Sequence, residues 1–160
     1  MGRYYRPDSV DEVCERLAAA DGDATIIAGG QTLTLHLRQG LKDPDEIIDV
    51  SEIDGLAHVT DEGDEIVIGN ATTYAELKRD DLVGEELPLL ADAMDEIAGP
   101  QVRHNGTIGG GLCYADPALD TPPVLMTYDA SVTLVGPDGR RTLPVDELYT
   151  GYYETALDAA

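Results

Sequence analysis

The sequence predicts a single α+β domain of two lobes: a small strand-helix-strand lobe at about residues 1–55 and a larger lobe with antiparallel hairpins at about residues 56–160. Three observations support this prediction. A chain of 160 residues that is 42% apolar has the length and composition of one folded domain, and it contains no linker or repeat. Two buried strands flank a helix between residues 24 and 50. Two turn signals, at 61–64 and 136–139, each separate a pair of short apolar segments.

Acidic residues dominate the charged surface: 32 Asp and Glu oppose 10 Lys and Arg, for a net charge of −22. Binding to nucleic acid or to an anionic membrane depends on clustered Lys and Arg, so the composition argues against both partners. The acids alternate with aliphatic residues and form no long block, which argues against disorder. We therefore expect a solvated acidic shell of the halophilic kind, whose self-repulsion is reduced by high salt.

Neither a targeting segment nor a metal site is evident. No apolar run approaches the about 18 residues of a membrane helix and no signal segment is present, so the expectation is a cytoplasmic protein without membrane insertion. Cys14 and Cys113 stand far apart, as do His36, His58 and His104. This spacing excludes a disulfide framework, a structural zinc site and a four-cysteine iron–sulfur cluster within the chain.

The smaller lobe is predicted to begin with a short strand or arm at Arg3–Pro7. Ser9 followed by Glu12 is a capping box, which predicts a helix start. The apolar face of this helix is formed by Val10, Val13, Leu17 and Ala20. Cys14 lies beside that face and is predicted to be a small core residue.

A strand-helix-strand unit follows. Ala24–Ala28 and Asp45–Val50 are short apolar runs typical of buried strands. Between them, Leu33, Leu35 and Leu37 favour a short helix, although their spacing of two also suits a strand. The two flanking strands are expected to be parallel, because a helix separates them.

The larger lobe is predicted to combine hairpins with capped helices. The hairpins pair 56–60 with 65–69 and 131–135 with 141–145. Thr73 and Glu76 form a second capping box that begins a helix. Pro88 opens a longer helical face that continues to Ala98, and Pro122 begins a short apolar helix.

Two glycine clusters are the strongest functional signal. Gly29-Gly30 lie between a predicted strand and a predicted helix, and Gly109-Gly110-Gly111 lie within an apolar segment. Each cluster alone is also explained by a tight turn. Without a Cβ, however, backbone N–H groups approach an anion closely, and a helix N-terminus favours phosphate. The spacing matches neither the dinucleotide pattern G-x-G-x-x-G nor the P-loop with its lysine.

If both clusters face one cleft, they are expected to hold an extended ligand with a central diphosphate through backbone dipoles, which suits a chain poor in lysine. Valine at Gly109 or Gly110 should then remove the ligand and leave the fold largely intact. Uncharged hydrogen-bonding groups near the clusters are Gln31, Thr32, Thr72, Asn105 and Thr107. Asp116 and Asp120 are spaced by four residues near prolines. We interpret them as a helix cap and a polyol contact, in preference to a pair of carboxylates for hydrolysis.

These motifs resemble the medium, FAD-binding subunits of the xanthine dehydrogenase and carbon monoxide dehydrogenase family. Residues 107–120, Thr-Ile-Gly-Gly-Gly-Leu-Cys-Tyr-Ala-Asp-Pro-Ala-Leu-Asp, are similar to the family's second FAD loop. Residues 28–33, Ala-Gly-Gly-Gln-Thr-Leu, are similar to its first. Residues 70–73, 100–103 and 151–157 also resemble the family, so the resemblance covers nearly the whole chain.

The resemblance implies a p-cresol methylhydroxylase type FAD domain with FAD as its cofactor. It places these residues on the adenine and pyrophosphate side: Ile27, Ala28, Gly29, Gly30, Gln31, Thr32 and Leu33. It places these at the diphosphate and ribityl atoms: Thr107, Ile108, Gly109, Gly110 and Gly111. Asp120 is implied as a ribityl contact and Ile97 as an apolar group near the cofactor. No catalytic residue or metal ligand is assigned to this chain.

The implied function is that of an FAD-binding electron-transfer subunit in a molybdenum-containing hydroxylase or dehydrogenase. In that family the flavin passes electrons between iron–sulfur clusters on a partner subunit and an external acceptor, while a third subunit carries the molybdenum cofactor. The family's C-terminal domain is expected to be absent from this chain. The alternative is therefore a truncated, non-catalytic FAD domain that binds FAD weakly or serves only in docking.

Overall fold

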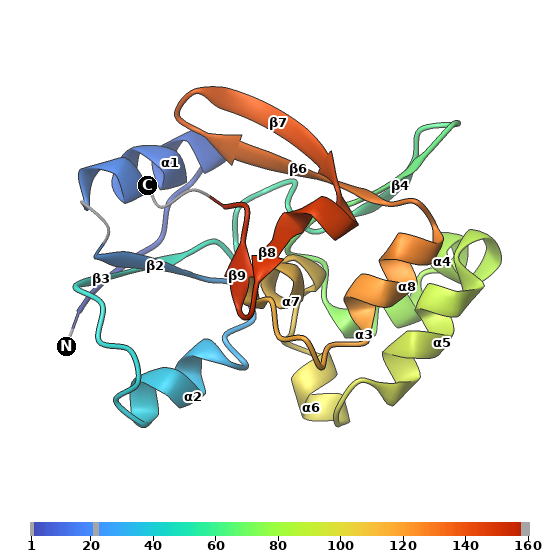
Figure 1. Cartoon of the computed structure of the whole chain (residues 1–160), viewed down its shortest axis with the longest axis horizontal. Coiled ribbons are helices and arrows are strands. Elements are labelled where there is room, and N and C mark those ends of the chain that lie inside the picture. Colours follow the sequence, from blue (N-terminus) through green and yellow to red (C-terminus); the bar gives the residue numbers. More distant parts are fainter. Residues whose placement is uncertain (1, 21–22, 158–160) are drawn as a thin grey trace.

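The computed structural model describes residues 2–20 and 23–157, and it shows two lobes side by side (Figure 1). The smaller lobe is built on a three-stranded sheet in the order β1 (Arg3–Tyr5), β3 (Glu46–Asp49), β2 (Ala24–Ile27). Both pairings are parallel, as predicted for the two flanking strands. The predicted N-terminal strand is confirmed, and it occupies the other edge of the sheet.

Helix α1 (Val10–Ala19) begins at the predicted residue. The Ser9 side chain accepts a hydrogen bond from the Glu12 backbone N–H at 3.3 Å. The predicted capping box is only half present, because the Glu12 carboxylate accepts from the Asp8 N–H at 3.0 Å and also bonds the Tyr5 hydroxyl. The helix thereby stays tied to β1, and it covers a core of Val13, Ile48, Val50 and Ile53.

Helix α2 (Leu33–Arg38) resolves the ambiguity left by the leucine spacing in favour of a helix. It follows β2 through Gly29 and Gly30, and the positive φ of +66° at Gly30 makes the turn. The structure thus confirms the predicted order of strand, glycine turn and helix.

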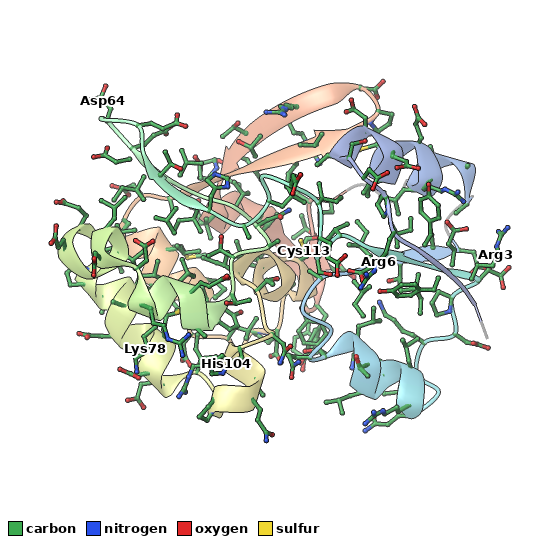
Figure 2. All side chains as sticks on the ribbon, turned by 180° about the vertical axis from the view of Figure 1, so that it is seen from behind. Arg3, Arg6, Asp64, Lys78, His104 and Cys113 are labelled. Carbon is green, nitrogen blue, oxygen red and sulfur yellow. The ribbon has the colours of Figure 1, made fainter. Side chains whose placement is uncertain are left out.

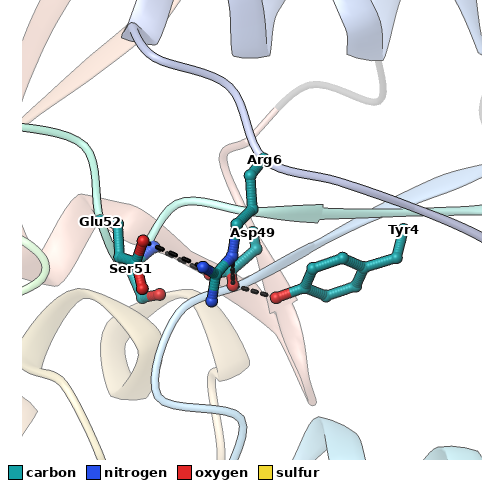
Figure 3. Close-up of polar contacts among 5 residues, drawn as sticks. All are labelled: Tyr4, Arg6, Asp49, Ser51 and Glu52. Carbon is teal, nitrogen blue, oxygen red and sulfur yellow. Dashed lines mark hydrogen bonds and ion pairs between the residues drawn. The ribbon is translucent and has the colours of Figure 1, made fainter.

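Asp49, at the end of β3, is a buried carboxylate with three donors around it (Figure 3). Its oxygens accept hydrogen bonds from the Tyr4 hydroxyl, from Arg6 Nε at 3.2 Å and from the Ser51 N–H at 2.9 Å. Burial alone would raise the pKa of Asp49, but these hydrogen bonds outweigh it and hold the pKa below its usual value. The network anchors the Ser51 turn to the first strand.

We expect the Asp49 network to make the protein acid-sensitive. A carboxyl whose pKa is lower in the folded state stabilises that state above the unfolded pKa of about 3.9, and this contribution is lost as the pH falls through the folded value. The free energy of unfolding of Asp49→Asn should therefore be about 1–3 kcal/mol lower than that of the wild type at neutral pH. On acidification it should fall less than that of the wild type. Urea unfolding between neutral pH and about pH 3 measures both quantities; equal acid sensitivity of the two proteins would contradict this account.

The larger lobe begins with the predicted hairpin of β4 (Val59–Asp61) and β5 (Ile66–Ile68). Helix α3 (Tyr74–Arg79) begins with the complete predicted capping box of Thr73 and Glu76. Helix α4 (Asp81–Glu86), capped by the Asp80 side chain, was not predicted, because its short and largely polar sequence has little helical periodicity.

Helix α5 (Pro88–Glu96) ends before Ile97 and Ala98, which the sequence pattern placed on its apolar face. The backbone leaves the helix at Ile97 and turns through Ala98, which has a φ of +44°. Helix α6 (Pro100–Arg103) then starts behind Gly99. Ile97 is nevertheless buried, in the core of the larger lobe.

Two further short helices, α7 (Ile108–Tyr114) and α8 (Thr121–Thr127), complete the helical part of the larger lobe. The helix predicted at Pro122 is α8. Helix α7 contains the three glycines, so this segment is helical and not an open loop. The core of this lobe consists of Tyr74, Leu77, Val83, Leu90, Met94, Ile97, Ile108, Leu112, Leu125, Val145 and Leu148.

The second predicted hairpin, β6 (Ser131–Gly136) and β7 (Gly139–Pro144), lies across α1 of the smaller lobe (Figure 1). Cys14 contacts this hairpin, with its sulfur 3.8 Å from the Val135 carbonyl oxygen. A 3-10 helix (Val145–Leu148) leads to a last small hairpin of β8 (Tyr149–Gly151) and β9 (Glu154–Thr155). Within the described ranges, no helix is long and apolar enough to span a bilayer.

Candidate cofactor site between the lobes

The first glycine cluster meets the chain segment that leads into the second. A Cβ at Gly29 would lie 1.8 Å from the Asn105 carbonyl oxygen and 2.9 Å from Gly106 Cα. Only glycine allows the backbones of the two lobes to approach this closely. The structure therefore brings the first predicted segment against Asn105 and Gly106, which precede the second, at the boundary between the lobes.

A cleft of about 290 Å³ opens beside this contact. The smaller lobe contributes Ala28, Gly29 and Ser51 to its wall, and the larger lobe contributes a polar wall that includes Thr73, Asn105 and Thr107. The Asp49 network holds the Ser51 turn in place at one side. The result is a polar cleft with main chain from both lobes at its surface.

The turn after β2 uses its carbonyl groups internally. The Gly29 oxygen accepts from Gln31 Nε2 at 3.2 Å, and the Gly30 oxygen accepts from the Thr34 N–H at 3.1 Å. The N–H groups of Gly30, Gln31 and Thr32 have no acceptor within residues 2–20 and 23–157. Such free N–H groups just before a helix are suited to a phosphate group, as the sequence indicated.

The three glycines of α7 behave differently from the prediction. Their N–H groups donate to the protein itself: Gly109 to the Asn70 carbonyl at 2.9 Å, Gly110 to Thr107 Oγ1 at 3.1 Å and Gly111 to the Thr107 carbonyl at 3.0 Å. In this conformation these amides are not free for a ligand. The three glycines indicated a conformationally free backbone, but the sequence did not show which groups accept hydrogen bonds from their N–H groups.

Close packing explains why two of these positions require glycine. A Cβ at Gly109 would lie 2.6 Å from the Cβ of Asn70, and a Cβ at Gly111 would lie 2.2 Å from the Tyr74 hydroxyl oxygen. The expectation that valine at Gly109 leaves the fold intact is therefore wrong. Gly110 faces solvent, with Thr107 Oγ1 as its nearest neighbour at 2.9 Å.

The remaining predicted residues lie in different surroundings. Thr107 is buried and caps α7, and Ile108 and Ile97 are buried in the core of the larger lobe. Asp120 is exposed at the start of α8 and makes no capping hydrogen bond with its side chain. Their contacts with FAD remain predictions.

Thr72 was also grouped with possible ligand-binding hydroxyls, and this expectation needs correction. Its side chain is buried, and its hydroxyl both donates to the His58 carbonyl and accepts from the His58 N–H, each at 3.0 Å. The hydroxyl thus joins the start of β4 to the segment before α3. It is part of the scaffold beside the cleft.

Sequence reasoning missed Arg103 as a structural residue. Its Nη1 donates to the carbonyl oxygens of Asp95, Ile97 and Ala98 at 3.1, 3.0 and 2.8 Å. These carbonyls lie at the end of α5, where helix carbonyls lack intrahelical partners. The signal was present, since a basic residue shortly after a helix end is typical of such a cap. Arg103 thereby fixes the segment that leads to the cleft wall at Asn105.

An aromatic cluster of Tyr114, Tyr152 and Tyr153 with His36 joins the lobes on another side. The Tyr114 hydroxyl lies 3.5 Å from His36 Nε2, and its ring meets that of Tyr153 at a centroid distance of 5.3 Å. Desolvation and the neighbouring Asp116 raise the pKa of Tyr153 to about 12, so its hydroxyl is protonated at neutral pH. The rings of this cluster thus pack against one another across elements from both lobes.

The fold and the cleft define a two-lobed α+β domain with a polar cleft at the boundary between its lobes. The chain belongs to the family described as the FAD binding domain in molybdopterin dehydrogenase, whose model matches residues 1–160. FAD is the cofactor of this class of domain. Among the described residues, no group of three or more His, Cys, Asp or Glu is placed to hold a metal ion.

Individual relatives agree with this assignment. The carbon monoxide dehydrogenase medium chain of Hydrogenophaga pseudoflava is 38% identical over 97% of this chain and 54% of its own length. The nicotine 6-hydroxylase medium subunit of Paenarthrobacter nicotinovorans is 37% identical over 98% of this chain and 55% of its own length. The chain therefore spans about half the length of the curated relatives it matches.

Solved structures show the same architecture. Carbon monoxide dehydrogenase from Hydrogenophaga pseudoflava superimposes with a TM-score of 0.96 over 99% of this chain and 55% of the matched chain, at 38% identity. Quinoline 2-oxidoreductase from Pseudomonas putida 86 gives 0.95 over the same shares at 31% identity. These matches confirm the predicted two-lobed FAD-domain fold.

Proposed function

We propose that this chain is the FAD-binding part of a medium subunit in a molybdenum-containing hydroxylase or dehydrogenase complex. In this proposal it passes electrons between iron–sulfur clusters on one partner subunit and an external acceptor, while another partner carries the molybdenum cofactor. The observation that carries the proposal is the contact of the Gly29 turn with Asn105–Gly106 beside a polar cleft, in a chain of an FAD-binding family. A cytoplasmic location belongs to the same proposal.

The residues present fit a dinucleotide. The free N–H groups of Gly30, Gln31 and Thr32 would hold phosphate oxygens without a cationic side chain, which avoids the need for lysine. Ser51, Thr73 and Asn105 supply uncharged hydrogen-bonding groups on the cleft wall. FAD, when bound, can accept or donate electrons singly or in pairs. It can therefore connect a one-electron carrier with a two-electron partner. The chain's own contribution is binding, orientation and the dielectric around the cofactor.

Reconstitution tests the proposal at its first step. Protein purified in high salt and mixed with FAD should retain visible flavin absorption after desalting. A folded protein that stays colourless with excess FAD would instead support the alternative, a non-catalytic remnant that serves only in docking.

Electron transfer is tested separately with the partners. We expect an iron–sulfur subunit, reduced with dithionite and freed of excess reductant, to form a complex with the FAD-loaded chain and to bleach its flavin absorption under anaerobic conditions. A stable complex in which the clusters stay reduced and the flavin stays oxidised would contradict the proposed electron path. The control is the same mixture prepared without FAD, in which no such absorption change is expected.

We also infer that the acidic surface is adapted to high salt. A net charge of −22 disfavours the compact state, and the screening length falls from about 10 Å at 0.1 M salt to about 3 Å at 1 M. The melting temperature should therefore rise with KCl concentration, and an uncharged osmolyte of equal osmolality should raise it less. A melting temperature that is independent of KCl would contradict this inference.

A further inference from the structure

A second hollow lies between α3 and α6, next to the interlobe cleft. Its volume is about 220 Å³, and Ala75, Lys78, Arg79, Pro100, Arg103 and His104 line it. We call it the cationic depression. Figure 2 shows Lys78 and His104 close together at this corner of the larger lobe, far from the Arg3 and Arg6 side chains.

The charge of this lining departs from that of the whole chain. Acidic residues outnumber Lys and Arg by 32 to 10, yet the lining contains three of those ten, one of three histidines and no acid. Arg103 caps the end of α5, and Lys78 and Arg79 lie in the last turn of α3, but together these three basic side chains surround one hollow whose lining has no acid. The lining therefore indicates an anionic ligand.

Hydrogen bonds fix the basic groups in place. His104 Nδ1 lies 2.7 Å from the Pro100 carbonyl oxygen, so Nδ1 carries the proton and Nε2 accepts from Arg79 Nη2 at 3.1 Å. Arg103 is held through Nη1 by the three carbonyls at the end of α5. Lys78 pairs with Asp95. Each arginine has five N–H donors and lysine has three, so donors are left over at fixed positions.

We propose that the cationic depression binds one small tetrahedral dianion, phosphate or sulfate, at a site separate from the FAD cleft. Its volume suits a single such ion with some of its water, and charge-assisted hydrogen bonds from fixed guanidinium groups are the usual means of holding one. The two sites share only one lining side chain, that of His104.

An acidic protein partner is a poorer occupant. Helix α5, which packs against α3, carries exposed carboxylates at Asp92, Asp95 and Glu96, and Asp95 pairs with Lys78 of the lining. A protein surface broad enough for stable docking would meet these carboxylates and be repelled. A small ion contacts the lining alone and does not have to approach the surrounding carboxylates.

Nuclear magnetic resonance of the ¹⁵N-labelled protein in about 1 M KCl tests the proposal, with inorganic phosphate exchanged for chloride at constant ionic strength. We expect saturable shifts of the backbone amides of Lys78, Arg79, Arg103 and His104. Arg79→Gln should weaken the binding about fivefold to tenfold through the loss of a charge-assisted hydrogen bond. The matched control is Arg140→Gln, an exposed arginine on β7, which should leave the affinity unchanged.

Four outcomes would overturn the proposal. Shifts that grow linearly with phosphate and never saturate would show non-specific screening only. Equal phosphate affinity in the wild type, Arg79→Gln and a second variant, Lys78→Met, would show that the cationic depression does not bind the ion. Binding of a hexaglutamate peptide without binding of phosphate would assign the surface to an acidic protein. Saturating FAD should leave the phosphate affinity unchanged; competition between them would mean that the site belongs to the FAD cleft.

Discussion

Valine at Gly109 is expected to destabilise the larger lobe strongly. Its Cβ would lie 2.6 Å from the Cβ and 2.7 Å from the carbonyl oxygen of Asn70, and the added methyl groups would press further on this segment. Moving the segment apart also breaks the hydrogen bond from the Gly109 N–H to the Asn70 carbonyl. Overpacking costs about 1–3 kcal/mol and a lost backbone hydrogen bond about 1 kcal/mol, which is a large part of a typical domain's stability.

Chemical unfolding of Gly109→Val beside Gly84→Val measures this effect. Gly84 lies on the exposed side of α4, and a Cβ there has no neighbour within 4 Å, so valine at that position should be nearly neutral. The account predicts a much lower unfolding midpoint for Gly109→Val alone. Equal midpoints for the two variants would show that the Asn70 contact is unimportant.

Alanine at Gly29 is expected to have the second large effect, this time on FAD binding. A Cβ placed 1.8 Å from the Asn105 carbonyl oxygen cannot be accommodated by a side-chain rotation, because the neighbour is backbone. The turn after β2 must move away from the cleft wall, and its free N–H groups move with it. A displacement of this kind should weaken FAD binding about 100-fold, which corresponds to about 2.7 kcal/mol.

The measurement is an FAD titration followed by flavin fluorescence, with Gly136→Ala as control. A Cβ at Gly136 has no neighbour within 4 Å, and this residue lies in the β6–β7 hairpin. Both variants should retain helix and sheet content by circular dichroism. If Gly29→Ala bound FAD with wild-type affinity, FAD binding would not depend on the interlobe contact, and FAD would have to bind elsewhere.

Local signals in the sequence predicted much of this fold. The Ser9 and Thr73 caps, the turn at 136–139 and the glycine turn after β2 are each determined by a few neighbouring residues, and all are present. Helices α4 and α7 were missed or misread for a physical reason. Tertiary packing stabilises them in spite of a polar or glycine-rich sequence, and no local pattern reports such packing.

The candidate site was predicted in outline only. The two glycine clusters do come from different lobes and approach each other, but through Gly29 and Asn105, with the α7 glycines turned toward Asn70 and Tyr74. A glycine that avoids a clash and a glycine that exposes its N–H look the same in a sequence. Likewise, Arg103 acts on carbonyl groups that become accessible only because α5 ends at Glu96.

The central claim is that both lobes hold one FAD molecule, the smaller lobe through free main-chain N–H groups and the larger lobe through polar side chains on the cleft wall. Hydrogen–deuterium exchange with increasing FAD tests it most directly, because the N–H groups of Gly30, Gln31 and Thr32 have no acceptor in the described part of the chain and should exchange fast without ligand. We predict that FAD slows exchange with the same midpoint in two sets of peptides. In peptides covering 27–33 it covers free N–H groups, and in peptides covering 105–111 it reduces the local opening of N–H groups that are already hydrogen-bonded. Protection of only one of these peptides, or of neither, would contradict the account.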